Sequence, residues 1–181
     1  IGVTGVQTCA LPILELYKGI KNELLNLTYT KEDNTTDKIK TVALWRNQLA
    51  REKEEIPFLY PAVFVEFLES SYMESSSKVY QTVEMTVRLH ICFESYLTED
   101  LDILNLTNKV FSRLQLKQFE YYGLLKRRSE DQNFDHPNVQ DFIQDYDVSL
   151  GKDYGADASP TTEAEIDTLI INAEYDNNLE N

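Results

Sequence analysis

The sequence is poor in basic residues. Its 181 residues contain 17 Lys and Arg against 31 Asp and Glu, so the formal net charge is −14. Affinity for nucleic acid comes largely from Lys and Arg that displace counterions from phosphates. This balance argues against sequence-independent DNA binding, although an acidic passage would let a duplex slide without sticking. Long apolar runs are also missing, since none approaches the roughly 20 residues that span a bilayer. The sequence predicts a soluble protein with no membrane partner.

Cysteine and histidine are scarce, with two residues of each. Cys9 lies in Val3–Ile13, VTGVQTCALPI, which looks like the translation of a common short-read sequencing adapter. We therefore expect residues 1–13 to be an artefact of metagenomic assembly, and the natural N-terminus to be missing. Only Cys92 then remains, so no intrachain disulfide is predicted and a reducing compartment is the natural inference.

Motifs of common active sites are absent. The sequence contains no GxxxxGK[ST], GxGxxG, GxSxG or HExxH. His90 and Cys92 form a His-x-Cys pair, but no other Cys or suitably placed His completes a zinc site. His90 lies among polar residues of a predicted strand, so we interpret it as a solvated sheet histidine. The sequence thus predicts no catalytic residue, no cofactor and no metal.

One acidic segment, SEDQNFDHPN, is a weaker candidate for a metal site. Carboxylates together with an imidazole can hold a divalent ion. The spacing matches no EF-hand, and Asp and Asn before a strand commonly satisfy turn backbone instead. We favour that structural role for its four candidate ligands: Glu130, Asp131, Asp135 and His136.

Residues 14–27 have one apolar stripe, which predicts an amphipathic helix. The polar residues 28–38 are predicted to form an exposed loop, and 39–45 a short strand. PAVFVEFLE, residues 61–69, is apolar on both faces, as is typical of a strand inside a sheet.

Residues 79–94 alternate most clearly. Apolar residues occupy the odd positions, with Gln81 as the exception, and polar residues occupy most even positions. This period of two predicts a long half-buried strand. We expect it to pair antiparallel with 61–69 through the Ser-rich turn between them.

A second helix is predicted across the sheet, with Thr98 as N-cap. Its inner face is expected to carry Leu104, Thr107, Phe111 and Leu114. Residues 124–129 predict a shorter strand, and the alternation of Phe142, Tyr146, Val148 and Leu150 predicts a last strand that ends at Gly151.

The predicted class is α+β. We expect an antiparallel-rich sheet of about four strands packed by two helices, in a single domain over residues 14–150. Residues 151–181 are an acidic C-terminal arm in which Lys152 is the only basic residue. An arm of this kind is usually disordered, but its apolar island could form a strand against a neighbour. The island comprises Ile166, Leu169, Ile170 and Ile171.

Lys126, Arg127 and Arg128 form the only basic cluster. Two interpretations are open: a solvated strand edge, or a contact with an acidic surface such as the arm of an adjacent copy. Together with the apolar island, these residues are the candidate contacts with other subunits or partners.

The order of these segments resembles the tail terminator, or tail completion, proteins of long-tailed bacteriophages. The resemblance covers about residues 14–150. It rests on LYKGIKNEL, PAVFVEF, the strand 79–94 and NFDHPNVQDFIQDYDVSL. It implies a non-enzymatic subunit that forms a ring, usually of six, on the head-facing end of the tail tube.

The resemblance also implies partners and a location. The ring would contact tail tube protein and the head–tail connector, and the genome would pass through its lumen without specific binding. Assembly would take place in the host bacterial cytoplasm and the product would be part of the virion. The alternatives are a head–tail adaptor or other neck protein, and a metal-dependent nuclease or hydrolase that uses Glu66, Glu84 and the Asp131–His136 segment.

Overall fold

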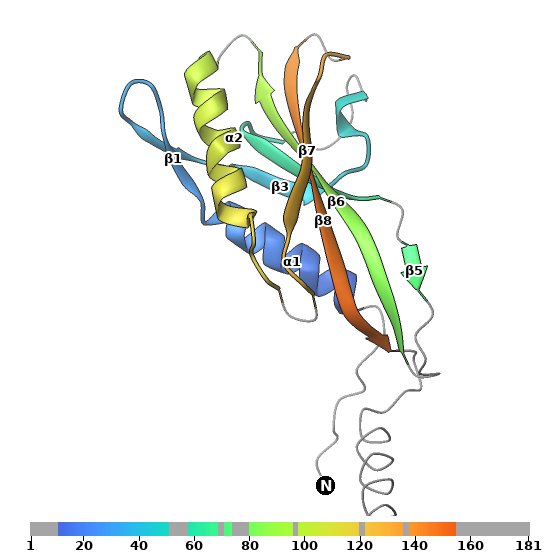
Figure 1. Ribbon diagram of the computed structural model, residues 1–181. Coiled ribbons are helices and arrows are strands. Elements are labelled where there is room, and N and C mark those ends of the chain that lie inside the picture. Colours follow the sequence, from blue (N-terminus) through green and yellow to red (C-terminus); the bar gives the residue numbers. More distant parts are fainter. Residues whose placement is uncertain are drawn as a thin grey trace, which may run out of the picture.

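The computed structural model describes residues 11–50, 58–68, 71–73, 80–95, 98–119, 122–135 and 138–154. These residues form an α+β fold with two α-helices on one face of a six-stranded sheet (Figure 1). The predicted class is therefore confirmed, but the sheet is larger than the four strands expected and a separate two-stranded hairpin accompanies it. The elements are α1 (Leu11–Leu25), β1 (Thr28–Thr30), β2 (Thr36–Lys38), β3 (Thr41–Leu44), a 3-10 turn (Gln48–Ala50), β4 (Ala62–Phe67), β5 (Ser71–Met73), β6 (Tyr80–Glu94), α2 (Asp100–Leu114), β7 (Lys126–Asn133) and β8 (Val139–Tyr154).

The sheet is built around the long β6–β8 ribbon. Its strand order is β3-β4-β6-β8-β7, and β5 pairs with the end of β6 that β4 leaves open. Only β3 and β4 are parallel, and every other pair is antiparallel. The predicted antiparallel pairing of β4 with β6 is confirmed. The Ser-rich segment between them is not all turn, because Ser71–Met73 form β5, and residues 74–79 lie outside the described part of the chain.

The alternation of β6 places one apolar face under the helices. Its described odd-numbered residues are at most 4% exposed, and they pack with the buried stripe of α1. Burial of side chains of this size stabilises the fold by about 1.5–3 kcal/mol each. This confirms the predicted half-buried strand and the predicted stripe of the first helix. The residues are Val83, Met85, Val87, Leu89, Ile91 and Phe93 of β6, and Leu16, Ile20, Leu24 and Leu27 of the α1 region.

The buried face of α2 matches the predicted one only in part, because Thr107 and Leu114 are buried as predicted but Leu104 is not. Its N-cap is Glu99, without a side-chain cap bond, rather than Thr98. Leu104 is 50% exposed, whereas Ile103 and Leu106 are buried. The buried face is rotated from the predicted one towards Ile103, Leu106 and Val110, whose branched aliphatic side chains pack into the core. The buried positions are Asp102, Ile103, Leu106, Thr107, Val110 and Leu114.

The polar segment 28–38, predicted as an exposed loop, is the β1–β2 hairpin. Tyr29 reaches the core and is 3% exposed. Asn34 takes the left-handed conformation at the turn, with φ 63°. Asp102 of α2 anchors the hairpin, since its carboxylate accepts the Glu32 backbone N–H at 2.7 Å. Burial of Tyr29 and the hydrogen bond to Asp102 therefore hold this polar segment as a hairpin against the helix.

The last two strands are longer than predicted. Strand β7 extends to Asn133 rather than Ser129, and β8 continues through Gly151 to Tyr154. Pairing with β6 and β7 supports these extensions, since Tyr80 lies opposite Tyr154. At the other end of the chain, α1 begins at Leu11 and Ile13 is 43% exposed, whereas residues 1–10 lie outside the described part.

Candidate functional site

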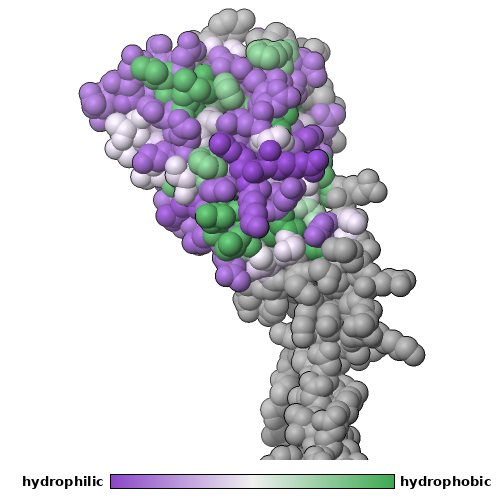
Figure 2. Space-filling model, in the orientation of Figure 1, coloured by the Kyte–Doolittle hydropathy of each residue, from purple (hydrophilic) through white to green (hydrophobic). Residues whose placement is uncertain are grey.

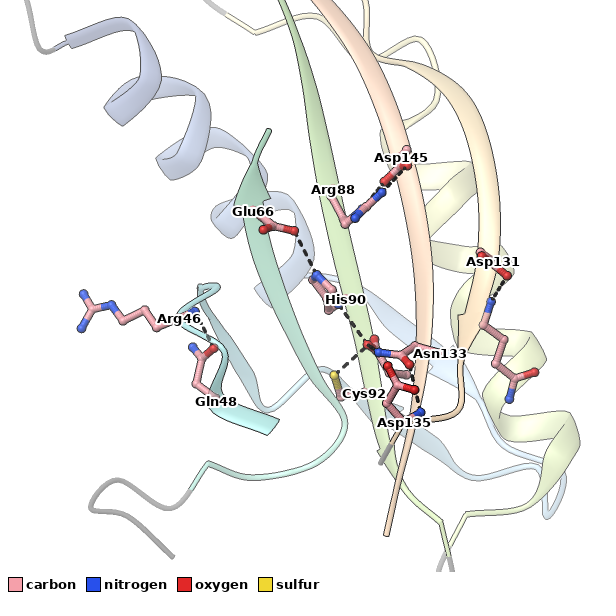
Figure 3. Close-up of polar contacts among 12 residues, drawn as sticks. Arg46, Gln48, Glu66, Arg88, His90, Cys92, Asp131, Asn133, Asp135 and Asp145 are labelled. Atoms are coloured by element: carbon pink, nitrogen blue, oxygen red, sulfur yellow. Dashed lines mark hydrogen bonds and ion pairs between the residues drawn. The ribbon is translucent and has the colours of Figure 1, made fainter. Parts of the chain in front are cut away.

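The helix-free face of the sheet carries a row of polar side chains centred on His90 (Figure 3). Its ring bridges two neighbouring strands. Nδ1 lies 3.0 Å from Asp141 Oδ2 on β8, and Nε2 lies 3.3 Å from Glu66 Oε2 on β4. A neutral imidazole has one N–H and donates to one carboxylate, whereas an imidazolium donates to both. His90 therefore links three strands through charge-assisted contacts.

Trp45 covers the exposed side of this group. Its ring stacks on His90 with centroids 3.9 Å apart and an interplanar angle of 9°. Two hydrogen bonds position Trp45, which directly follows β3. The backbone N–H of Trp45 donates to Val65 O at 2.8 Å, and Gln48 Nε2 donates to Leu44 O at 2.6 Å. Together these contacts leave His90 only 5% exposed.

The prediction that His90 is solvated is therefore wrong, and its neighbour Cys92 is fully buried as well. A second, small core covers this end of the face. Phe64 and Cys92 form its centre, and Trp45, Phe58 and Tyr60 pack against it. The alternation of β6 identifies the apolar face correctly, but it does not reveal that the polar face is covered as well.

Cys92 is not poised as a nucleophile. Burial raises the pKa of its thiol well above the ordinary value, and the adjacent Asp141 carboxylate adds to the rise. The Cys92 thiol donates to Asp141 Oδ1 at 3.8 Å and so remains protonated. Reactive cysteines need the opposite, a lowered pKa with access to solvent.

A second ion pair lies next along the face. The Arg88 guanidinium donates to both oxygens of Asp145, at 2.8 and 3.0 Å, and Ser129 Oγ donates to the same carboxylate at 3.1 Å. Hydrogen bonding from Arg88 lowers the pKa of Asp145 and raises that of Arg88. The pair links β6, β8 and β7 across the sheet.

The acids considered for a metal-dependent enzyme do not gather. Glu66 contacts His90, whereas Glu84 is exposed further along β6, opposite Ser149 and Ser71. No group of three His, Cys, Asp or Glu side chains suited to a metal ion occurs in the described part of the chain. The absence of a catalytic residue, a cofactor or a metal stays a prediction.

The SEDQNFDHPN segment is not the loop predicted for it. Glu130 and Asp131 lie on β7, which continues to Asn133. Glu130 accepts from Gln144 Nε2 at 2.9 Å, so it is part of the sheet. The turn itself uses Asn133 Oδ1, which accepts the Asp135 N–H at 3.0 Å, in agreement with the structural role favoured above. His136 lies outside the described residues.

The basic cluster lies on β7, an outermost strand of the sheet. Arg127 turns towards the helices, with its guanidinium 3.8 Å from the Phe111 ring centroid and 3.0 Å from Glu130. Lys126 and Arg128 instead line a groove on the helix-free face with a volume of about 510 Å³. Arg128 is 65% exposed and lies 3.8 Å from Asp147. Two of the three residues are thus open to a partner.

The predicted arm contacts cannot be placed. Ile166, Leu169, Ile170 and Ile171 lie outside the described residues, as does the whole segment 155–181.

Sequence analysis missed Asp141, Asp145 and Trp45 as parts of this face. A signal exists for the two acids, which lie four residues apart on the polar side of β8. That spacing equals the one between Arg88 and Cys92 on the same side of β6, which lie directly opposite Asp145 and Asp141. The register that brings each acid to its base becomes visible only in the sheet.

No protein-family model and no curated protein matches this chain. None of the helices in the described residues has both the length and the apolar character needed to cross a membrane.

Proposed function

We propose that the protein is a structural virion protein of a long-tailed bacteriophage. It acts as a tail terminator that caps the tail tube as a ring, most simply a hexamer, and joins the tail to the head connector. The proposal starts from the resemblance of residues 14–150. It gains support from a feature of the sheet that the sequence did not reveal.

The observation that carries the proposal is the free edge of β7. The strand has eight residues, and among the described strands only β8 pairs with it. Residues 128–131 in its middle are all exposed. The start of this edge is covered, since the Arg127 N–H donates to Gln115 Oε1 at 2.9 Å, so the open part begins at Arg128. Such an edge offers N–H and C=O groups that proteins usually cover or pair. Addition of a neighbour's strand would satisfy them.

The geometry of the sheet suits a ring. β3 and β7 lie at its opposite ends, so a contact made through one end leaves the other available. Such head-to-tail contacts are heterologous, and they close into rings when the rotation between subunits allows it. A self-complementary patch would stop at a dimer.

The helix-bearing face is less suited to be the main contact. Figure 2 shows it as mainly hydrophilic, with hydrophobic side chains in separate patches. Large assembly interfaces normally have a continuous apolar centre. We therefore assign assembly to the sheet edge. The net charge of −14 suits a lumen that repels the passing genome.

Negative-stain electron microscopy of the full chain tests this proposal. The chain is examined over a concentration series, alone and with preformed tubes of the matching tail tube protein. We expect rings, or tubes capped at one end. Tubes from an unrelated phage are the control and should remain bare.

Particles of one-subunit size throughout, with bare ends on matching tubes, would refute the proposal. Binding to portal protein would then be measured, because a head–tail adaptor would bind portal instead of the tube.

A further inference from the structure

Two rows of paired residues connect the opposite ends of the sheet, from β7 through β8, β6 and β4 to β3. The first row joins Asp131 to Ala43. The second row joins Asn133 to Thr41. Residues of one row lie at the same height in the sheet, because paired strands hold their partners side by side. A second copy placed beside this sheet at the same height would therefore set its β3 end against Asp131. The intermediate partners are Ile143, His90 and Phe64 in the first row, and Asp141, Cys92 and Ala62 in the second.

The two ends of the sheet carry open charges of opposite sign. Asp131 is exposed, and its carboxylate accepts only the Gln132 N–H at 2.8 Å, without an ion pair in the part of the chain that the structure describes. Arg46 is exposed two residues after β3, and its backbone N–H donates to Gln48 Oε1 at 2.7 Å. Its guanidinium has no ion pair within the described ranges. Figure 3 shows the Arg46 side chain pointing away from the sheet, on the opposite side of His90 from Asp131.

These two charges cannot meet within one chain. Four strand spacings separate β3 from β7, which amounts to about 19 Å across the sheet. The neighbouring acid Glu130 is already engaged, since it accepts from Arg127 at 3.0 Å and from Gln144 at 2.9 Å. Asp131 is therefore the acid of the open β7 edge that remains for a cation of another molecule.

Each end of the sheet also presents an exposed apolar side chain. Phe134 is 80% exposed and directly follows Asn133, the last residue of β7. Leu59 is 66% exposed and lies beside Thr41, because its N–H donates to Thr41 Oγ1 at 3.0 Å. They are the two most exposed large hydrophobic side chains in the described part of the chain. Since they lie at the two ends of the second row, the step that brings the opposite charges together also brings these side chains together.

We propose that the open β7 edge of one subunit docks on the β3 end of a second copy. Asp131 pairs with Arg46 across this contact, and Phe134 packs against Leu59. The inference rests on the proposed assembly into rings and names the two surfaces that join neighbouring subunits. Because the surfaces differ, each subunit keeps one of them for a further copy, as a head-to-tail ring requires.

Zero-length carbodiimide cross-linking of the full chain tests the contact directly. The reagent joins an amine to a carboxylate that touches it, so Arg46→Lys supplies the amine and keeps the charge. Equal amounts of ¹⁵N-labelled and unlabelled R46K chain are mixed below the assembly midpoint, concentrated, cross-linked and digested for mass spectrometry. We expect a link from position 46 to Asp131 with one heavy and one light partner. R46K/D131N is the matched control and should lose this link.

Charge reversal provides the second measurement. We expect R46D and D131R each to raise the midpoint concentration for assembly about ten-fold, measured by sedimentation velocity. An equal mixture of the two variants should assemble like the wild type, because copies that alternate around a ring place every reversed charge against an opposite one. K109D on α2 and E84R on β6 are the controls, since they reverse exposed charges away from both ends of the sheet and should leave the midpoint unchanged.

The apolar contact has its own variant. Leu59→Ala should raise the assembly midpoint about ten-fold, because it removes a side chain that the contact buries. Leu104→Ala is the matched control, since Leu104 is also exposed but lies on α2, and it should leave the midpoint unchanged.

Links only between peptides of the same label would overturn the second copy as the occupant. The contact itself would be overturned if the wild-type chain assembled but position 46 formed no link to Asp131. Midpoints of R46D and D131R equal to those of K109D and E84R, or a mixture that assembles no better than either variant alone, would do the same. Failure of the proposed function differs from all of these results, because the wild-type chain would then form no assembly at any concentration.

Discussion

Replacement of His90 by Leu should destabilise the protein severely. The substitution removes the imidazole that lies 3.0 Å from Asp141, whose side chain is completely buried. Two weak donors would remain to this carboxylate: the Cys92 thiol at 3.8 Å and the Asn133 amide at 3.4 Å. Loss of one partner from a buried charged pair costs about 3–5 kcal/mol. For a chain of this size, that corresponds to a fall in melting temperature of roughly 6–20 °C.

The assay is urea unfolding followed by circular dichroism and by tryptophan emission. Trp45 is the only tryptophan and stacks on His90, so its emission reports on this region while the circular dichroism reports on the whole fold. Asp141→Leu completes a double-mutant cycle with His90→Leu. We expect the double variant to cost much less than the sum of the single variants, because apolar replacement of a whole buried pair is often nearly neutral.

Glu84→Leu is the control for this cycle. Glu84 is an exposed residue on the same strand, so its replacement should change the free energy of unfolding by no more than about 0.5 kcal/mol. If His90→Leu cost as little as Glu84→Leu, or if the two single changes simply added, the reasoning about a buried charge-assisted bridge would be refuted.

Three further predictions concern the core, α2 and the pH dependence. Val87→Asp should prevent folding, because Val87 is 1% exposed under the helices and an unpaired charge there is costly; a native circular dichroism spectrum would contradict this. Leu106→Ala should lower the free energy of unfolding by about 2–5 kcal/mol, whereas Leu104→Ala should change it by under about 1 kcal/mol, and equal urea midpoints would show that the face of α2 is misplaced. The pKa of Asp145 is lower in the folded protein than in the unfolded chain, where it is about 3.9, so the ionised carboxylate stabilises the fold at pH values above about 3.9. This stabilisation is lost as the pH falls through the pKa of the folded state. Asp145→Asn should therefore flatten the fall in urea midpoint below about pH 4, and an unchanged slope would exclude Asp145 as its source.

The elements with a strong period could be predicted from the sequence. The alternation of 79–94 and the stripe of the first helix each identify a buried face, because burial must follow the geometry of the strand or helix. The α+β class follows from the order of these elements. Strand ends are less predictable, since β7 and β8 continue for as long as their neighbours can pair with them.

Only the tertiary structure decided the chemistry of the second face. His90 and Cys92 have the same polar pattern in the sequence whether water or protein covers them. Burial depends on Trp45 and on the segment around Phe58, which reach this face from elsewhere in the chain. Asp141 likewise approaches His90 only because of the register between β6 and β8. The two residues are 51 positions apart in the sequence. The alternation of residues within one strand shows which side chains share a face, but it does not show which strand pairs with that strand or in which register.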